Sequence, residues 1–214
     1  MAGLNPRVET FIRRFARVAT RAVVANPRLW RLFRGPLRKQ FDWLAPSWEG
    51  RRGPEALAPL EAALERLPGP PRRVLDLGTG TGKAARTVAE RFSDSQVFAV
   101  DLSAAMIEEA RRLLPAELGE RVRFMVADSA VLPFVNGEFD LVVLLNMIPF
   151  FDELARVTAP GGHVLFAFSS GADTPIYVPP ETLRKRLGAV GFTDFEELAA
   201  GDGNAFLAAR TDPG

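Results

Sequence analysis

Three carboxylates follow short apolar runs in the middle of the chain, and the first of them opens a glycine-rich turn. Residues 74–77 form a brief apolar run with Asp76 inside it, and the alternating glycines of residues 78–82 follow directly. Glycine permits positive φ and lets another group approach the backbone closely. A helical pattern begins after residue 82, and the first N–H groups of a helix have no partner within it. This turn is therefore expected to hold a ligand.

The spacing of the turn separates three ligand classes. A phosphate-binding P-loop would need a glycine where Leu77 stands and a hydroxyl where Ala84 stands, so that interpretation fails twice. A dinucleotide fingerprint would need a glycine in place of Lys83, so it remains a weaker alternative. The third pattern, an acid followed by three alternating glycines, resembles the first motif of the Rossmann-like S-adenosylmethionine (SAM) dependent methyltransferases.

The other two carboxylates stand at matching places of this family. Residues 95–101 form a second predicted strand that ends in Asp101, nineteen positions after Gly82. An acid there can accept hydrogen bonds from both ribose hydroxyls. A third predicted strand, residues 122–127, precedes Asp128, where the resemblance implies a contact with the adenine amino group. The resemblance implies ten cofactor-binding residues: Asp76, Gly78, Thr79, Gly80, Gly82, Asp101, Leu102, Asp128, Ser129 and Asn146.

The same resemblance implies the fold. It covers residues 72–170 closely and predicts an α/β, doubly wound, mostly parallel seven-stranded sheet of order 3-2-1-4-5-7-6. Gly201-Asp202-Gly203 is typical of a tight hairpin, so the last strand should run antiparallel. Residues 71–214 are expected to form the SAM-binding methyltransferase domain, with S-adenosylhomocysteine as product, and residues 1–70 an N-terminal helical extension.

The amino-acid composition excludes several kinds of catalytic and metal-binding site. The chain has 214 residues, 25% of them charged, with no cysteine and a single histidine, His163. Disulfides, thiolate metal sites and a cysteine nucleophile are thereby excluded, and no metal is expected. No apolar run is long enough for a transmembrane helix, and arginines interrupt the first forty residues where a secretory signal would stand. A cytoplasmic location is the resulting expectation.

The first 41 residues, which we call the arm, are strongly basic. They hold ten Arg or Lys and one acid, whereas the remainder holds 17 basic and 25 acidic residues. Phe11, Phe15, Val18 and Ala22 recur at helical spacing and predict one apolar face, expected to pack over the core. Asn26-Pro27 should end this helix, and Gly35-Pro36 should interrupt the next. A further helix is predicted over residues 54–67, before the first strand.

Three interpretations of the arm stay open. Its helices can pack over the core with solvated arginines, lie on an anionic membrane surface, or contact RNA. No known RNA-binding module accompanies the arm, so no nucleic acid partner is expected. The family's usual helix and loop after Asn146 is short in this chain, which leaves a cleft above the strand ends. The hypothesis is that the arm closes this cleft as a lid.

The expected reaction is methyl transfer from SAM to a small, apolar or aromatic molecule. Phe150, Phe151 and Tyr177 are candidates for an apolar acceptor wall, although both phenylalanines could equally belong to the core. No catalytic residue is assigned. Two segments, 41–45 and 132–134, resemble ubiquinone and menaquinone biosynthesis methyltransferases. The alternatives are a non-catalytic SAM-binding or partner-binding protein and, more distantly, a nicotinamide-dependent oxidoreductase.

Overall fold

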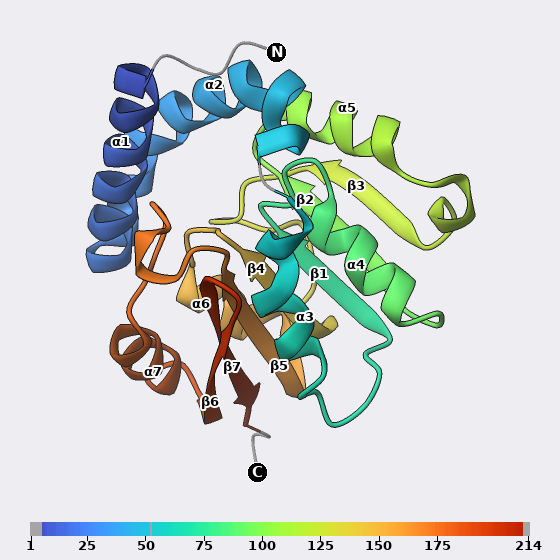
Figure 1. Ribbon diagram of the computed structural model, residues 1–214. Helices are drawn as coiled ribbons and strands as arrows, with labels where there is room; N and C mark the ends of the chain where they lie inside the picture. Colours follow the sequence, from blue (N-terminus) through green and yellow to red (C-terminus); the bar gives the residue numbers. More distant parts are fainter. Residues whose placement is uncertain (1–5, 52, 212–214) are drawn as a thin grey trace.

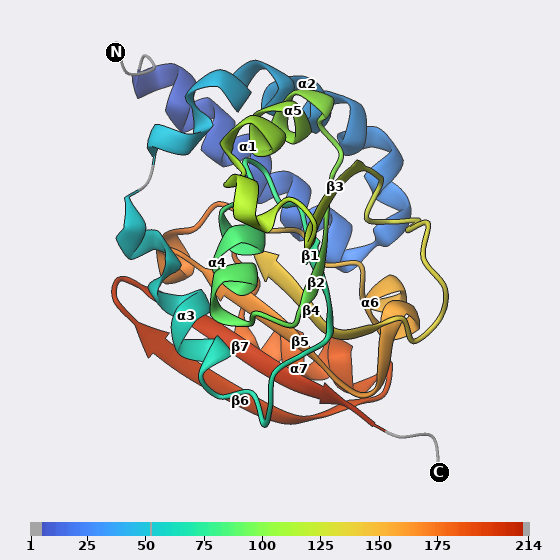
Figure 2. The same cartoon turned by 90° about the vertical axis from the view of Figure 1, so that its right-hand side faces the viewer.

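The computed structural model describes residues 6–51 and 53–211, which fold around one seven-stranded sheet (Figures 1 and 2). The strand order β3-β2-β1-β4-β5-β7-β6 confirms the predicted topology. β7 is antiparallel to both of its neighbours, and the pairs on the other side of the sheet are parallel. The strands are β1 (Arg73–Leu77), β2 (Gln96–Asp101), β3 (Val122–Val126), β4 (Phe139–Leu145), β5 (Thr158–Phe168), β6 (Phe192–Ala200) and β7 (Gly203–Arg210).

Helices cover both faces of the sheet, because its central strands are apolar on both sides. On one face, Val74 and Leu141 pack in a cluster with residues of α3 (Ala58–Leu64), α4 (Lys83–Arg91) and α5 (Ala104–Leu113). On the other, Leu75 and Val142 pack with α6 (Phe151–Val157) and α7 (Pro180–Gly188). The segment predicted as a helix over 54–67 is a 3-10 turn followed by α3, which ends at Leu64.

The predicted interruption of the second helix at Gly35-Pro36 is wrong. α2 (Trp30–Trp48) continues through Pro36 and also contains Pro46. A proline inside a helix removes one backbone hydrogen bond and crowds the preceding turn. The compensation is burial, because Leu37, Leu44 and Ala45 of α2 are nearly inaccessible to solvent. Tertiary packing thus overrides the local signal.

The predicted apolar face of the first helix packs only in part. α1 (Pro6–Ala25) ends at the predicted Asn26-Pro27, and its buried residues are Ala16, Ala19, Thr20 and Val23. Of the predicted face, Phe15 is half-buried and packs against a cluster formed with α2 and the loop after β4, whereas Phe11 is 70% exposed and Val18 58% exposed. Small side chains let the helix approach its neighbours closely. Phe11 and Val18 consequently face outward.

α1 and α2 lie across the edge of the sheet at which β1, β2 and β4 end (Figure 1). In the structure the arm extends beyond residue 41 to the end of the 3-10 turn Glu49–Arg51, so from here the name covers residues 6–51. Three sets of side-chain contacts hold them there: Trp30 contacts Asp128, Glu49 contacts the glycine turn, and Arg13 contacts Asp173. None of the described helices is both long and apolar enough to cross a membrane.

Candidate active site

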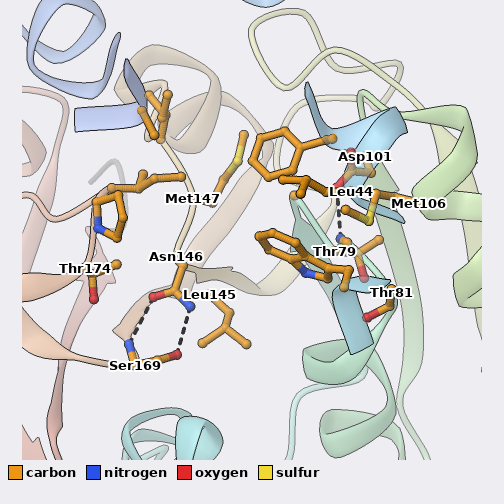
Figure 3. A pocket seen from close by; sticks show the side chains of 18 of the residues that line it. Leu44, Thr79, Thr81, Asp101, Met106, Leu145, Asn146, Met147, Ser169 and Thr174 are labelled. Carbon is orange, nitrogen blue, oxygen red and sulfur yellow. Dashed lines mark hydrogen bonds between the residues drawn. The ribbon is translucent and has the colours of Figure 1, made fainter. Parts of the chain in front are cut away.

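A cavity of about 390 Å³ lies between the carboxyl ends of the strands and the arm (Figure 3). Its floor comes from the turns after β1, β2, β4 and β5, and its roof comes from α1, α2 and the segment that follows them. In open parallel sheets, ligands bind outside the carboxyl ends of the strands. The volume is within the range of small-molecule sites. The cavity is therefore the candidate ligand site.

The glycine turn takes the backbone form that the sequence indicates. Gly78, Gly80 and Gly82 have φ values of 67°, 55° and 85°, in the left-handed region that favours glycine. A Cβ on Gly78 would lie 2.4 Å from Sδ of Met147, and one on Gly80 would lie 3.1 Å from Nε1 of Trp48. Gly78 and Gly80 line the cavity, where their bare backbone leaves room for another group.

Gly82 has a different role from the other two glycines. A Cβ there would lie 2.9 Å from the ring of Phe124, a residue of β3 in the sheet core. Gly82 does not line the cavity. Its conformation instead brings the start of α4 against the sheet.

Asp76 is buried at the floor of the cavity with one oxygen unused. Its Oδ2 accepts a hydrogen bond from the Thr79 hydroxyl at 2.6 Å, whereas Oδ1 has no hydrogen-bond partner among the described residues. Burial raises the pKa of Asp76 from 3.8 to about 7, and the charge of Asp101 adds to this, against the opposing effects of the Thr79 hydroxyl and of the backbone N–H of Ala85. The Ala85 N–H lies near the carboxylate but does not form a hydrogen bond with Oδ1. A buried acceptor without a partner is costly in a protein interior. A cationic group in the cavity would satisfy it.

Asp101 is held by backbone donors on both sides. Its Oδ2 accepts from the N–H of Gly80 at 2.9 Å (Figure 3). Its Oδ1 accepts from the N–H of Ser103 at 2.8 Å. Burial raises its pKa to about 6, and the nearby Asp42 adds to this effect. Each oxygen retains acceptor capacity. The carboxylate is thus rigidly placed on the cavity wall beside Leu102, which also lines it.

Asn146 takes a strained conformation at the end of β4. Its φ is 54°, and its side chain makes two hydrogen bonds with Ser169, one to Oγ at 2.8 Å and one from the N–H at 3.0 Å (Figure 3). A positive φ at a residue other than glycine costs on the order of 1 kcal/mol. The Ser169 contacts stabilise it. Asn146 lines the cavity with Met147.

Asp128 is the one predicted site carboxylate that does not line the cavity, although its neighbour Ser129 does. Its Oδ1 accepts from the indole N–H of Trp30 at 2.8 Å and from the N–H of Ala130 at 2.9 Å. Arg34 lies 3.6 Å from Oδ2. The arm therefore already occupies the group that the resemblance assigns to adenine.

The arm contributes a contact that the sequence did not reveal. Glu49 follows α2 and accepts hydrogen bonds from the Thr81 hydroxyl at 2.5 Å and from Arg86 at 2.9 Å. The ammonium of Lys83 donates to the Glu49 carbonyl at 2.9 Å. The indole of Trp48 lies above Gly80, next to these contacts of Glu49. No spacing in the sequence links residue 49 with residues 81–86, so only the fold could show it.

The aromatic residues predicted as an acceptor wall lie elsewhere. Phe151 is buried in the sheet core, Phe150 packs edge-on against Trp30, and Tyr177 packs against Phe168. None of the three lines the cavity. The aromatic part of the wall comes instead from α2, through Trp30, Phe41 and Trp48. Aliphatic side chains from the arm and from the loops after β4 and β5 add to it, among them Ile12, Ala16, Leu37, Met147, Ile148 and Ile176.

The glycine turn, the two buried carboxylates and the sheet order are those expected of a Rossmann-like SAM-dependent methyltransferase domain, and the comparisons with known proteins confirm this resemblance over the middle of the chain. Residues 74–162 match the family described as "Methyltransferase domain". The chain is 40% identical over 126 residues to a malonyl-[acyl-carrier protein] O-methyltransferase of Halorhodospira halophila, covering 56% of this chain and 39% of that relative. It is 40% identical over 113 residues to a demethylmenaquinone methyltransferase of Thermus thermophilus, covering half of each chain.

Solved structures share the fold over more of the chain. The putative methyltransferase in a complex with the Haloferax volcanii Trm112 methyltransferase activator has a TM-score of 0.69 at 18% identity, covering 80% of this chain and 98% of that one. A SAM-dependent methyltransferase from Aquifex aeolicus has a TM-score of 0.60 at 16% identity, covering 80% and 97%. The chain spans about half the length, or less, of the curated relatives it matches most strongly. Both curated relatives and both of these solved structures are named as methyltransferases.

Proposed function

We propose that this protein is an enzyme that transfers a methyl group from SAM to a small, apolar or aromatic molecule. One observation carries the proposal: Asp76 Oδ1 is buried without a partner at the floor of a cavity whose wall also presents Asp101. The ammonium of the SAM amino acid portion would satisfy the first carboxylate, and the ribose hydroxyls the second. The donor and acceptor set of the cavity fits the cofactor.

The remaining cofactor contacts follow from the same arrangement. Gly78, Thr79 and Gly80 present backbone to the amino acid portion, and Leu102 lies where it can pack against the nucleoside. Ser129 and Asn146 complete the floor. Gly82 acts indirectly, by shaping the turn. Asp128 reaches the adenine amino group only if it shares its Oδ1 with Trp30 or uses Oδ2.

When bound, SAM supplies an activated methyl group that passes in line to the acceptor atom, leaving S-adenosylhomocysteine. The chain's contribution is alignment and exclusion of water. Asp76 and Asp101 anchor the two ends of the cofactor, and the arm roofs the cavity. The carboxylates of Asp152 and Asp173 and the carboxylate of Glu153, which is paired with Arg156, do not line the cavity. Glu9 of α1 does line the cavity and lies outside the proposed cofactor contacts. The proposed acceptor is one that needs little help to lose a proton, such as a phenol or an activated carbon acid.

We assign residues 71–214 to the methyltransferase domain and the helical extension of residues 1–70 to a lid that completes the cavity. Eleven of the cavity-lining residues precede residue 55, which supports the lid assignment.

We further propose a cytoplasmic location and a peripheral contact of the arm with membrane lipids. A small-molecule acceptor agrees with the quinone and tocopherol acceptors in the relatives' names.

Calorimetry with SAM, S-adenosylhomocysteine and NAD tests the cofactor assignment. Both SAM and its product should bind, NAD should not, and Asp76→Asn should weaken the binding of SAM. Methyl transfer from radiolabelled SAM to a panel of quinols, tocopherol precursors and malonyl-acyl carrier protein tests the acceptor class. Binding of NAD in place of SAM would overturn the cofactor assignment. Tight SAM binding with transfer only to the acyl carrier protein would refute the small-acceptor proposal.

A further inference from the structure

The outward face of α1 combines cations and apolar side chains in one continuous stripe. Arg7, Phe11, Arg14, Val18 and Arg21 follow one another at intervals of four, three, four and three residues, and all five are exposed. Such spacing places residues on one side of a helix. The opposite side carries the buried Ala16, Ala19 and Val23. The stripe is thus a second functional face, separate from the one that packs.

The exposure of this stripe is unusual for a helix that packs on a soluble domain. Large apolar side chains on a water-facing side bury nothing, so the packing of the fold does not explain Phe11 at 70% and Val18 at 58% exposure. α1 lies at the margin of the molecule, with α2 between it and α5 (Figure 1). Two further exposed apolar residues, Leu32 and Trp43, belong to α2 of the same arm.

We infer that the outward face of α1 docks on an anionic lipid surface. Arginines flanking exposed Phe and Val suit the headgroup layer, where cations meet anionic lipids and apolar side chains enter the acyl boundary. Charge supports this occupant: the first 41 residues hold ten basic residues and one acid. Arg14 and Arg21 have no salt bridge within 4.0 Å in the described part of the chain.

Docking through this face would place the cavity close to the lipid. Ile12, Arg13 and Ala16 line the cavity from the other side of the same helix turns that carry Phe11 and Arg14. An apolar molecule leaving a bilayer would meet the arm before the sheet. This consequence rests on the proposed methyl transfer, whereas the docking, which assigns the lipid contact proposed above to one face of α1, does not.

Flotation of the full-length protein with vesicles tests the inference. The probes are phosphatidylcholine vesicles with and without 30% phosphatidylglycerol, at low and at physiological salt. We expect the protein to float with the anionic vesicles and not with the zwitterionic ones, more strongly at low salt. The double variant Arg14→Glu/Arg21→Glu should lower the partition coefficient more than about tenfold, because each basic residue near the surface contributes about 1 kcal/mol.

Matched variants distinguish docking through this face from nonspecific adsorption to vesicles. Phe11→Ser/Val18→Ser should lower flotation, whereas Val131→Ser/Val135→Ser, on an equally exposed connector far along the chain, should leave it unchanged. SAM binding by each variant reports whether the domain remains folded. Equal flotation of Phe11→Ser/Val18→Ser and Val131→Ser/Val135→Ser would overturn the inference. No flotation of the unaltered protein would also overturn it. So would a protein that instead forms a dimer which Phe11→Ser/Val18→Ser dissociates.

Discussion

The two sides of the cavity are built by different means. On the sheet side, Asp101 is fixed by N–H groups of the backbone, and the glycine turn is held by its own φ values. On the arm side, the polar contacts are made by side chains, namely Trp30 to Asp128, Glu49 to Thr81 and Arg13 to Asp173, and apolar side chains of α1 and α2 pack against Met106, Ile148 and Phe150. Backbone contacts move only with the fold, whereas a few side-chain contacts can break together. The sheet side, which we call the platform, is therefore rigid, and the arm side, which we call the roof, can separate from it.

The strongest test of this difference removes a carboxylate from the platform. Asp101→Ala should lower the affinity for SAM about 100-fold, because two hydrogen bonds from the ribose to a charged acceptor are lost. Calorimetry measures the affinity. Asp140→Ala is the matched control, because Asp140 also accepts two backbone N–H bonds but does not line the cavity. Similar affinity losses in the two variants would show that the effect is a general loss of structure.

A change in the roof should increase the opening of the arm and leave the affinity for SAM unchanged. Glu49→Ala removes the acceptor for Thr81 and Arg86, and the arm amides should exchange with solvent about tenfold faster. Hydrogen exchange measured by mass spectrometry reports this. Glu197→Ala is the control, because it breaks only the exposed surface pair with Arg184. Unchanged exchange in α2 of the Glu49 variant would contradict a detachable roof.

The pH dependence of SAM binding distinguishes the two carboxylates of the platform. Only the ionised form of Asp76 attracts an ammonium group, and its pKa is about 7. The affinity should therefore fall about tenfold between pH 8 and pH 6. In the absence of ligand, a rise in pH has the opposite effect, because it lowers the contribution of Asp76 to the free energy of unfolding. The folded-state pKa lies above the unfolded value, so the contribution of Asp76 to stability is full below about pH 4 and declines as the pH rises to about 7.

Asp76→Asn should bind SAM more weakly than the unaltered protein at pH 8, with an affinity that changes little between pH 8 and pH 6. Calorimetry over this range checks both the affinity and its slope. A variant that keeps the full pH dependence would assign the titration to another group, such as Asp101 with its pKa of about 6.

The smallest expected effect concerns the place where roof and platform meet. Trp30→Phe keeps an aromatic side chain but replaces the indole by a smaller phenyl ring and removes the N–H that Asp128 accepts at 2.8 Å. The free energy of unfolding should fall by about 1 kcal/mol. If Asp128 holds the adenine amino group, the affinity for SAM should rise about threefold, because Oδ1 becomes available. Unchanged affinity would indicate that Asp128 serves only to hold the arm.

Much of the platform was predictable because its signals are local. An acid, alternating glycines and a second acid nineteen residues later describe a strand, a turn and a neighbouring strand, and parallel pairing of β1 with β2 brings them together. The hydrogen bond between Gly80 and Asp101 follows from that pairing. The short apolar runs bounded by turn residues located the strands, whereas their order was predicted from the family resemblance and not from local patterns.

The sequence by itself therefore determined the sheet, the glycine turn and the placement of Asp76 and Asp101. Only the tertiary structure decided which face of α1 packs, that α2 continues through Pro36, and that Trp30 and Glu49 contact residues 98 and 32 positions away. The physical reason is the range of the interactions. Backbone conformation and strand patterning act over a few residues, whereas helix packing is chosen by shape and burial against surfaces that exist only once the sheet has formed.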